Sequence, residues 1–389
     1  MILFKECDVF TPEKIGRKDV LLAGKNIIAI ADKIDLPAAL IKNLDVGVIP
    51  AKGLRMIPGL IDSHVHIAGA GGEGGPASRT PEMPPGKMIE GGITTVIGCL
   101  GTDGLTRSVE SVLMKAKGLR AEGLSAWIYT GSYQVPPPTL LGDVGKDIAL
   151  IDEVIGVGEI AVSDHRSSGP TVEQLIHLVE HARVGGLLGG KAGIVNFHIG
   201  DAKNPFDILY QVVEKSELKF SQFLPTHCNR NPWIFEDAKE FGKKGYVDLT
   251  TSSYPYYPDE EVKSSTGVVE LVKAGVPLEH ITMSSDGCGS LPRFDASGNL
   301  ISLDSGEPKS LFIELIDLVE KEKFPMEKAL QVVTSNVAGI LKLSSKGRIA
   351  VGMDADVVLL DKEYRILHLT ANGVLMVKEG KRIKKSFFE

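Results

Sequence analysis

The sequence predicts an α/β fold, a (β/α)8 TIM barrel with a small β-sandwich-like domain built from both chain ends. Eight short apolar runs recur through the middle of the chain, and segments of helical length separate most of them. Buried strands that alternate with helices form parallel βαβ units, and eight such units make a barrel of ~250 residues. At both ends of the chain, short β-rich runs with turn residues between them replace this alternation.

The expected elements follow the chain in order. β-rich runs near the start include DVLLAG and NIIAIA. The barrel strands are expected at MIPGLIDSHVHI, TTVIGCLG, SAWIYTGS, EIAVSDH, IVNFHIG, FLPTHC, VDLTTSS and ITMSSDG. Helices are expected at TRSVESVLMKAKGLRAEG, TVEQLIHLVEHARVGG and PWIFEDAKEFGKKG, and the last strands at ADVVLLD, RILHLTANG and VLMVKEGK. We therefore place the barrel at residues 57–345 and the small β-domain at residues 1–56 plus 346–389.

One glycine-rich segment, GGLLGGKA at residues 185–192, nearly matches the phosphate-binding GxxxxGK[ST] loop. Ala192 stands where that loop needs a hydroxyl side chain, and a strand rather than a helix is expected after it. We therefore expect a helix-to-strand loop over this segment.

Composition excludes several classes of protein. The chain has 389 residues, of which 43% are hydrophobic and 24% charged, as in ordinary globular proteins. The net charge of −7, without a long basic run, argues against nucleic-acid binding. The four cysteines lack paired spacing, which favours a reducing cytoplasm over a disulfide framework or a CxxC zinc site. Neither a signal peptide nor a run of ~20 apolar residues is visible, so no membrane association is expected.

Polar residues suited to catalysis recur at one position of this pattern, at or near the C-terminal end of the expected strands. In a (β/α)8 barrel those ends form the face that carries the active site. Any one such residue alone is more often structural, but their repetition at successive strand ends favours a shared site. The residues are His64, His66, Thr102, Tyr133, Glu159, His198, His227 and Asp286.

The histidines and the aspartate predict a metal centre. Side chains two residues apart on a strand point the same way, so His64 and His66 face the barrel mouth together. Imidazole and carboxylate suit Zn²⁺, Mn²⁺, Fe²⁺ or Co²⁺. His64 and His66 together with His198, His227 and Asp286 make five candidate ligands, more than the three protein ligands of the usual catalytic zinc site. We therefore expect two ions ~3.5–4 Å apart that share a bridging hydroxide.

Several blocks carry a family resemblance. GLIDSHVHI, the later single histidines, the final aspartate and GMDADVVLLD resemble the metal-dependent amidohydrolase superfamily. Within it the chain is most similar to isoaspartyl (β-aspartyl) dipeptidases, through GAGGEGGPASRTPE, GCLGTDG, GSYQVP, SDHRSS, RVGGLLGGK, LPTHCNRN and SSDGCGS. The resemblance implies a metallopeptidase that cleaves the isopeptide bond of isoaspartyl dipeptides by attack of a bridging hydroxide. It also implies a homo-oligomer, such as an octamer.

In such enzymes a carboxylated lysine on the fourth strand most often bridges two divalent metal ions. The corresponding segment here, GVGEIAVSDHRSS, has no lysine, and Glu159 takes its place. The resemblance then implies that Zn²⁺ ions are held in two sets that share Glu159. The first set adds His64, His66 and Asp286, and the second adds His198 and His227. Because Glu is shorter, the strand or an ion must shift; the alternative is a partly solvated Glu159 beside a single metal ion.

The substrate of this family carries one free ammonium and two carboxylates. Glu73 is the expected partner of the ammonium, and Gly71 lets the backbone approach closely. Arg166 and Arg230 are the expected partners of the carboxylates, since guanidinium binds them in bidentate fashion.

Four further roles follow from the resemblance and the chemistry. Thr102 and Ser290 are expected to add hydrogen bonds to the substrate, and Tyr133 to stabilise the developing oxyanion. Asp286 is expected to take a proton from the nucleophile and deliver it to the leaving amine.

Three alternatives stay open. Another binuclear cyclic-amide hydrolase, of the dihydroorotase or hydantoinase type, would keep the metals but lack Glu73 and the arginine pair. A one-metal deaminase would not need Glu159. A non-catalytic scaffold relative would usually have lost metal ligands, and apart from the Lys-to-Glu change none of the expected types is missing.

Overall fold

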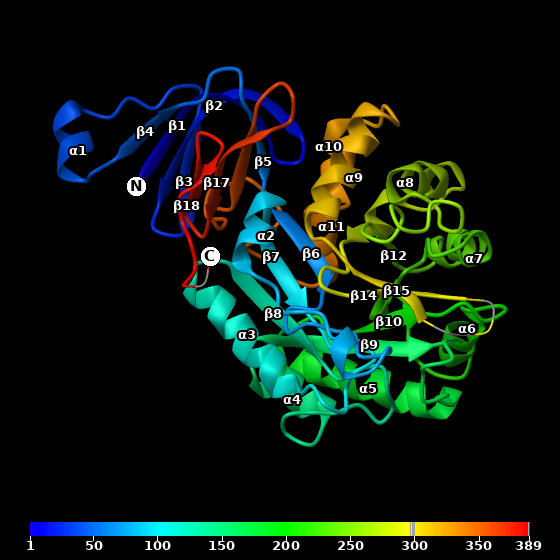
Figure 1. Ribbon diagram of the computed structural model, residues 1–389. Helices are drawn as coiled ribbons and strands as arrows, with labels where there is room; N and C mark the ends of the chain where they lie inside the picture. Colours follow the sequence, from blue (N-terminus) through cyan, green and yellow to red (C-terminus); the bar gives the residue numbers. More distant parts are fainter. Residues whose placement is uncertain (296, 298–299, 388) are drawn as a thin grey trace.

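The computed structural model describes residues 1–389 except 296, 298–299 and 388. The chain forms a barrel of parallel strands wrapped by helices and, beside it, a mixed sheet that contains both chain ends (Figure 1). The predicted fold class is confirmed.

Eight parallel barrel strands lie within the described residues, one at each of the eight apolar runs that the sequence analysis singled out. Backbone hydrogen bonds pair the first six side by side and the last two with each other. Between the last and the first strand, the Asp286 amide donates to the His64 carbonyl at 3.1 Å, and the His66 amide donates to the Gly287 carbonyl at 2.9 Å. The strands are β6 (Leu60–Val65), β7 (Ile93–Gly98), β8 (Ser125–Thr130), β9 (Val154–Val162), β10 (Ile194–Ile199), β11 (Phe223–Thr226), β12 (Val247–Thr250) and β13 (Ile281–Ser284).

The helices between and after these strands bury one face against the barrel. Side-chain caps fix several of their first turns, as at Thr171, whose hydroxyl accepts from the Gln174 amide while the Gln174 side chain accepts from the Thr171 amide. The helices are α2 (Pro85–Glu90), α3 (Val109–Ala121), α4 (Val144–Leu150), α5 (Val172–Gly189), α6 (Asp207–Glu214), α7 (Pro232–Gly242), α8 (Ser264–Lys273), α9 (Lys309–Glu320), α10 (Met326–Gln331) and α11 (Ser335–Ile340).

The structure corrects the expectation of a loop at residues 185–192. Helix α5 continues through Gly189, so most of that glycine-rich segment forms its last turn. A Cβ atom on Gly185 would lie 2.6 Å from the Gly145 carbonyl oxygen. The helix end packs directly on neighbouring backbone, and glycine is the residue that leaves room for this contact.

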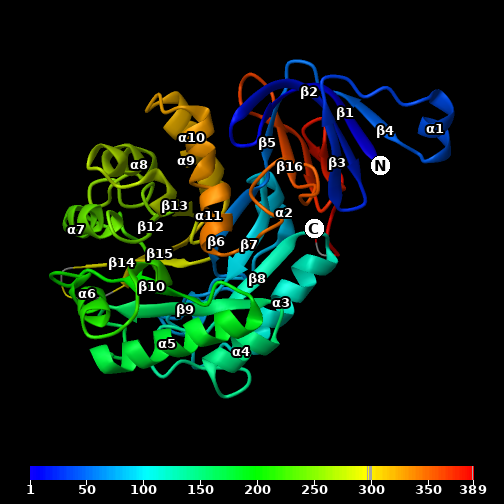
Figure 2. The same ribbon diagram turned by 180° about the vertical axis from the view of Figure 1, so that it is seen from behind.

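The mixed sheet joins the two ends of the chain. Strand β5 pairs in parallel with β1 and antiparallel with β16, so N-terminal and C-terminal strands lie side by side (Figure 2). A short helix, α1 (Ala38–Asn43), precedes β4. The strands are β1 (Ile2–Phe10), β2 (Lys14–Ala23), β3 (Asn26–Ala31), β4 (Gly47–Pro50), β5 (Arg55–Pro58), β16 (Val357–Leu360), β17 (Ile366–Ala371), β18 (Val374–Lys378) and β19 (Lys381–Arg382).

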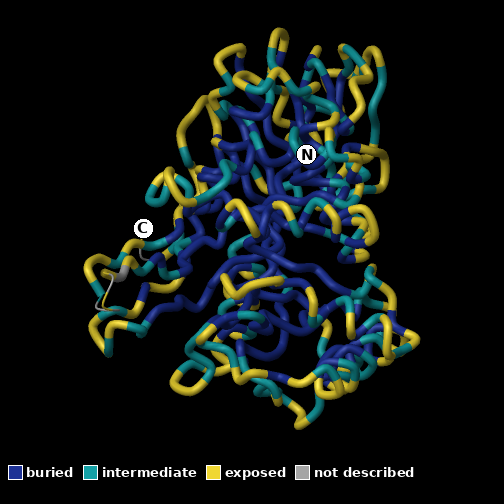
Figure 3. The backbone as a smooth tube through the Cα atoms, turned by 90° about the vertical axis from the view of Figure 1, so that its right-hand side faces the viewer, coloured by how far each residue is buried: buried dark blue, intermediate teal, exposed yellow. Residues whose placement is uncertain are grey.

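Buried backbone runs through the centre of both parts, while the exposed segments lie mainly in the outer loops and turns (Figure 3). A hairpin that the sequence analysis did not anticipate, β14 (Ser290–Phe294) and β15 (Leu300–Ser305), follows the last barrel strand. Its first residue, Ser290, adjoins the site described below. No helix within the described residues combines the length and apolar character that crossing a membrane requires.

Candidate metal centre

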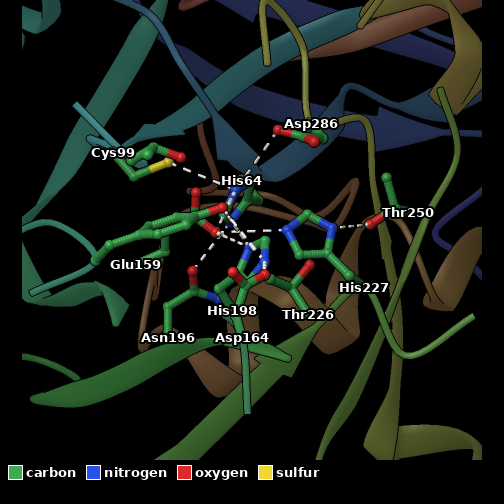
Figure 4. A network of polar contacts seen from close by, with 12 residues as sticks. His64, Cys99, Glu159, Asp164, Asn196, His198, Thr226, His227, Thr250 and Asp286 are labelled. Carbon is green, nitrogen blue, oxygen red and sulfur yellow. Dashed lines mark hydrogen bonds and ion pairs between the residues drawn. The ribbon is translucent and has the colours of Figure 1, made fainter. Parts of the chain in front are cut away.

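Four histidines surround the carboxylate of Glu159. Its Oε2 atom lies 3.4 Å from His64 Nε2, 3.1 Å from His198 Nδ1 and 3.4 Å from His227 Nε2. Its Oε1 atom lies 3.4 Å from His66 Nε2. The rings come from β6, β10 and the residues that directly follow β6 and β11. Those of His64, His198 and His227 point toward one another in Figure 4. Strands far apart in the sequence thus bring five predicted ligands to one place.

A β-bulge positions Glu159. Between Val157 and Ile160, β9 has one residue more than the facing segment of β10, so the pairing register shifts at this point. The Glu159 amide instead donates to the Leu100 carbonyl at 3.3 Å. Bulges re-aim side chains and are frequent beside active sites. The sequence analysis expected the strand or an ion to shift because Glu is shorter than a modified lysine, and the strand is irregular at this residue.

Asp286 also contacts this histidine cluster. Its Oδ1 atom lies 3.0 Å from His66 Nε2 and 3.7 Å from His64 Nε2. That oxygen is buried and accepts no hydrogen bond within the described part of the chain. Asp286 and His227 have positive φ angles of 53° and 62°. Non-glycine residues rarely adopt this conformation, and functional sites are where it concentrates.

These donors fit a divalent cation. With metal–ligand bonds of about 2.0–2.2 Å, two nitrogen or oxygen ligands of one tetrahedral zinc ion lie roughly 3.3–3.6 Å apart. The spacing of Glu159 from His64, His66 and His227, 3.4 Å in each case, falls in that range. The Asp286 oxygen without a hydrogen bond is the kind of atom that an ion would satisfy.

The electrostatics of the cluster favour bound positive charge. Burial opposes protonation of His64, but neighbouring Cys99 and Glu159 nevertheless raise the pKa of its imidazole well above the ordinary value. Burial likewise opposes ionisation of Glu159, yet His64 and His198 hold the pKa of its carboxyl well below its usual range. The carboxylate is therefore ionised and the site attracts a cation.

Neighbouring side chains orient the imidazoles. Asn196 Oδ1 lies 2.9 Å from His64 Nδ1, and Thr250 Oγ1 lies 2.7 Å from His227 Nδ1. Such contacts at the far ring nitrogen fix the ring and its tautomer, which strengthens the other nitrogen as a metal ligand. For His198 the far nitrogen is Nε2, which lies 3.0 Å from Asp164 Oδ2. The Tyr133 hydroxyl lies 2.8 Å from His198 Nδ1, the nitrogen that faces Glu159, and burial raises the pKa of this phenol well above its ordinary value, so that it remains a donor.

A cavity of about 560 Å³ opens beside the cluster. All of the predicted site residues except His64, which is fully buried, contribute to its lining. These lining residues are His66, Gly71, Glu73, Thr102, Tyr133, Glu159, Arg166, His198, His227, Arg230, Asp286 and Ser290. The structure therefore places the predicted ligands and the predicted substrate contacts around one space.

Glu73 is held in this cavity by two hydroxyl groups. Ser290 Oγ donates to its two carboxylate oxygens at 3.0 and 3.2 Å, and Thr102 Oγ1 donates at 3.2 Å. Arg166 Nη1 lies 3.5 Å from the same carboxylate. Thr102 and Ser290, expected as direct substrate contacts, thus position Glu73 in this structure.

Asp164 organises the two arginines. Arg166 donates to both of its carboxylate oxygens, at 3.0 and 2.9 Å, and Arg230 Nη1 lies 3.7 Å from one of them. Burial opposes ionisation of Asp164, but the hydrogen bonds from His198 and Arg166 hold its pKa far below the ordinary value. The Arg166 guanidinium also lies over the Tyr133 ring, 5.4 Å from its centre. Both arginines are therefore fixed at the edge of the metal cluster.

Four residues of this site were not predicted from the sequence. Asn196 could have been found, because it precedes His198 by two residues and thus lies on the same face of its strand. Thr250 ends the seventh barrel strand, and Asp164 lies within the SDHRSS block. Cys99 directly follows β7, and its lack of a paired cysteine drew attention away from it.

Residues 55–387 match the Amidohydrolase family, which is most of the chain. The chain belongs to the amidohydrolase family. This amidohydrolase is 43% identical to a structure of β-aspartyl dipeptidase from Fervidobacterium islandicum AW-1 in complex with β-Asp-Leu dipeptide, with a TM-score of 0.91 and 99% of each chain covered. The predicted resemblance is confirmed, and the cluster supplies ligands of the kind that bind the divalent metals of this family.

More distant matches include a dihydroorotase and a D-hydantoinase. A dihydroorotase from Streptococcus pyogenes is 27% identical over 94% of this chain and 92% of its own length. D-hydantoinase from Thermus sp. is 16% identical with a TM-score of 0.68, covering 99% of this chain and 97% of that one. The latter shares the fold of this amidohydrolase.

Proposed function

We propose that this amidohydrolase is a metal-dependent β-aspartyl (isoaspartyl) dipeptidase. It hydrolyses the amide bond between the side-chain carboxyl of an aspartate and the amino group of the following residue. The observation that carries the proposal is the arrangement of Glu73, Arg166 and Arg230 around one cavity beside the histidine cluster. The likeness to the Fervidobacterium islandicum enzyme, whose structure holds β-Asp-Leu, supports the same substrate class.

The charges of the cavity match those of an isoaspartyl dipeptide. Its free ammonium binds Glu73, which is largely shielded from solvent and oriented by Ser290. Its two carboxylates bind Arg166 and Arg230, whose guanidinium nitrogens lie 3.4 and 3.1 Å from His198 Nε2 at the edge of the cluster. These pairs fix both ends of the dipeptide, which holds the isopeptide carbonyl at the cluster.

Two divalent ions, for which Zn²⁺ is the best-suited candidate, would be held in two sets that share Glu159. The first set consists of His64, His66 and Asp286 with Glu159, and the second of His198 and His227 with Glu159. When bound, the ions would polarise the amide carbonyl and lower the pKa of water at the site, so that hydroxide is available near neutral pH.

The chain's own residues supply the proton transfers and part of the charge stabilisation. Asp286 takes the proton of the attacking water and then delivers it to the leaving nitrogen, because an amide nitrogen must be protonated to depart. The Tyr133 hydroxyl donates to the oxygen on which negative charge develops. Asp286 contacts the histidine cluster through His66 and Tyr133 contacts it through His198, and both side chains line the cavity that would take the substrate carbonyl.

Three further proposals concern the whole chain. The division into residues 1–56 plus 346–389 and residues 57–345 is supported by a separate apolar cluster in the mixed sheet, which includes Phe4, Val20 and Val357. A cytoplasmic location is supported by the four cysteines, all of which are unpaired. A homo-oligomer follows from the resemblance and is tested by light scattering of the purified protein.

A cyclic-amide hydrolase is the second candidate function, because the curated relatives include dihydroorotases at 24–27% identity. The two candidate functions are distinguished by which substrate the protein hydrolyses faster. Purified protein is offered β-Asp-Leu and dihydroorotate at equal concentration, and product release is followed by chromatography. Hydrolysis of β-Asp-Leu at least about a hundredfold faster than that of dihydroorotate supports the dipeptidase. This selectivity corresponds to a difference of about 2.7 kcal/mol in activation free energy between the two substrates. The reverse preference assigns the chain to the cyclic-amide branch.

A further inference from the structure

Cys99 differs from the other three cysteines in what its sulfur faces. The thiols of Cys7 and Cys228 each lie 3.3 Å from a backbone carbonyl oxygen, and that of Cys288 lies 4.0 Å from the Met83 sulfur. The Cys99 sulfur lies 3.7 Å from His64 Nε2 and 3.8 Å from His66 Nδ1. It is fully buried, and Figure 4 shows it directed toward the His64 ring.

Hydrogen bonding from a thiol accounts poorly for this position. Cys99 Sγ has three possible acceptors at similar distances, the two imidazole nitrogens and the Val65 carbonyl oxygen at 3.7 Å. A thiol has one hydrogen and can donate to one of them. A sulfur that shares an ion with His64 Nε2 has no such restriction, and His66 would bind the same ion through its other ring nitrogen, Nε2, which faces Glu159 and Asp286.

The distances match those of ligands around one ion. With Zn–S of about 2.3 Å and Zn–N of about 2.0–2.1 Å, sulfur and nitrogen on a tetrahedral zinc ion lie roughly 3.6 Å apart. The 3.7 Å between Cys99 Sγ and His64 Nε2 is close to this value. One ligand atom from each of His64, His66, Cys99 and Glu159 can be chosen so that all four lie within 4.8 Å of one another. All four residues are buried.

We propose that Cys99 is a further ligand of the first metal ion and binds it as a thiolate beside His64 and His66. On binding, the S–H bond breaks, the proton passes to water, and the sulfur electron pair forms the bond to the ion. The inference rests on the proposed metal centre and deepens it. Because thiolate is a soft ligand, it biases the first position toward Zn²⁺ or Co²⁺ and away from Mg²⁺ or Mn²⁺.

This assignment also bears on Asp286. With Cys99 added to His64, His66, Glu159 and Asp286, the first ion would have five protein ligands. Release of Asp286 would then open a position for water and make its carboxylate available for the proton transfers proposed above. The competing explanation is that Cys99 only fills space, since its side chain also belongs to a buried apolar cluster of the barrel.

Cobalt spectroscopy separates the two explanations. The full chain is stripped of metal, reloaded with Co²⁺ alone, and its cobalt content and absorption spectrum are measured. A thiolate ligand gives an intense sulfur-to-cobalt charge-transfer band in the near ultraviolet, which imidazole and carboxylate ligands do not. We expect this band in the unmodified protein, its loss in Cys99→Ser, and its retention in Cys7→Ser. Cys7 is a matched control because it is equally buried but lies in the mixed sheet.

Chelator competition gives a second readout. Cys99→Ser should lose one of its two cobalt ions at a chelator concentration about tenfold or more below that needed for the unmodified protein. Two bound cobalt ions without the charge-transfer band in the unmodified protein would overturn the inference, as would an unchanged band in Cys99→Ser. If either of these results is obtained and the unmodified protein cleaves β-Asp-Leu, the proposed function is retained and Cys99 is not a metal ligand. A chain that binds no cobalt and cleaves nothing contradicts both.

Discussion

Replacement of Glu73 by Gln tests how the substrate ammonium is recognised. The Glu73 carboxylate has a side-chain exposure of 10% and accepts hydrogen bonds from Ser290 and Thr102, so its charge is held in place and little screened. Glutamine keeps the shape but removes the charge and one acceptor. A hydrogen bond to a charged group contributes about 1.5–3 kcal/mol, which corresponds to a decrease in kcat/KM for β-Asp-Leu of about 10- to 150-fold.

A substrate without the α-amino group makes this test specific. N-succinyl-leucine has the same isopeptide bond and carboxylates as β-Asp-Leu but no ammonium. We expect Glu73→Gln to change kcat/KM for this analogue by less than about threefold, because the lost charge has nothing to pair with. Glu260→Gln, an exposed residue in the lining of the same cavity, is the control for charge in general. An equal loss on both substrates would refute the assigned role of Glu73.

Three further predictions concern stability and metal binding. Burial raises the pKa of Glu261 from 4.5 to about 7, so the native protein keeps a proton that the unfolded chain releases between these values. Glu261 alone should therefore lower the stability of the metal-stripped protein by roughly 3 kcal/mol as the pH rises through that window. Burial also raises the pKa of Asp62 to about 7, so urea unfolding of Glu261→Gln should show a smaller decrease, and an unchanged pH slope would contradict the assignment. Lys346 is buried with two carboxylates at 2.6 and 2.9 Å, so Lys346→Met should lower the urea unfolding free energy by roughly 3–5 kcal/mol, and a loss below about 1 kcal/mol would count against it. Gly101→Ala would place a Cβ 2.8 Å from the His66 ring, so zinc affinity in chelator competition should fall about tenfold or more, whereas Gly118→Ala, with open space around it, should not change it.

The fold and most of the candidate site could be predicted because they depend on local patterns. Each barrel strand is a short apolar run, and each candidate ligand stands on such a run or a few residues after its end. In a barrel these ends meet, so His64 and Asp286 come together although they are far apart in the sequence. The family resemblance, rather than the strand pattern, singled out Glu73, Arg166 and Arg230, which line one cavity.

Other features depend on contacts that no local pattern encodes. The bulge at Glu159 arises from the register between two strands, which a single strand sequence does not reveal. Asp164 belongs to a block that was identified, but its role became visible only when both arginines were seen to turn toward it. Cys99 was dismissed for lack of a neighbouring cysteine, whereas its partners are histidines of the adjacent strand.

The predicted C-terminal end of helix α5 was wrong for a related reason. Glycines near the end of a helix normally indicate where it stops, but here the helix continues through Gly189, and Gly185 and Gly189 pack on the backbone at Gly145 and Ile148. This close approach is a tertiary contact, and it overrides the low intrinsic helix propensity of glycine.

The most direct test of the central claim is leucine release from β-Asp-Leu and from α-Asp-Leu by the purified protein. The protein is reloaded with Zn²⁺ and assayed without added bicarbonate, because a glutamate bridge, unlike a carboxylated lysine, needs no carbon dioxide. Rapid cleavage of the β-linked peptide alone is the predicted result, and it would support both the isoaspartyl specificity and Glu159 as the shared carboxylate. If neither peptide is cleaved although two zinc ions are bound, the substrate assignment is contradicted.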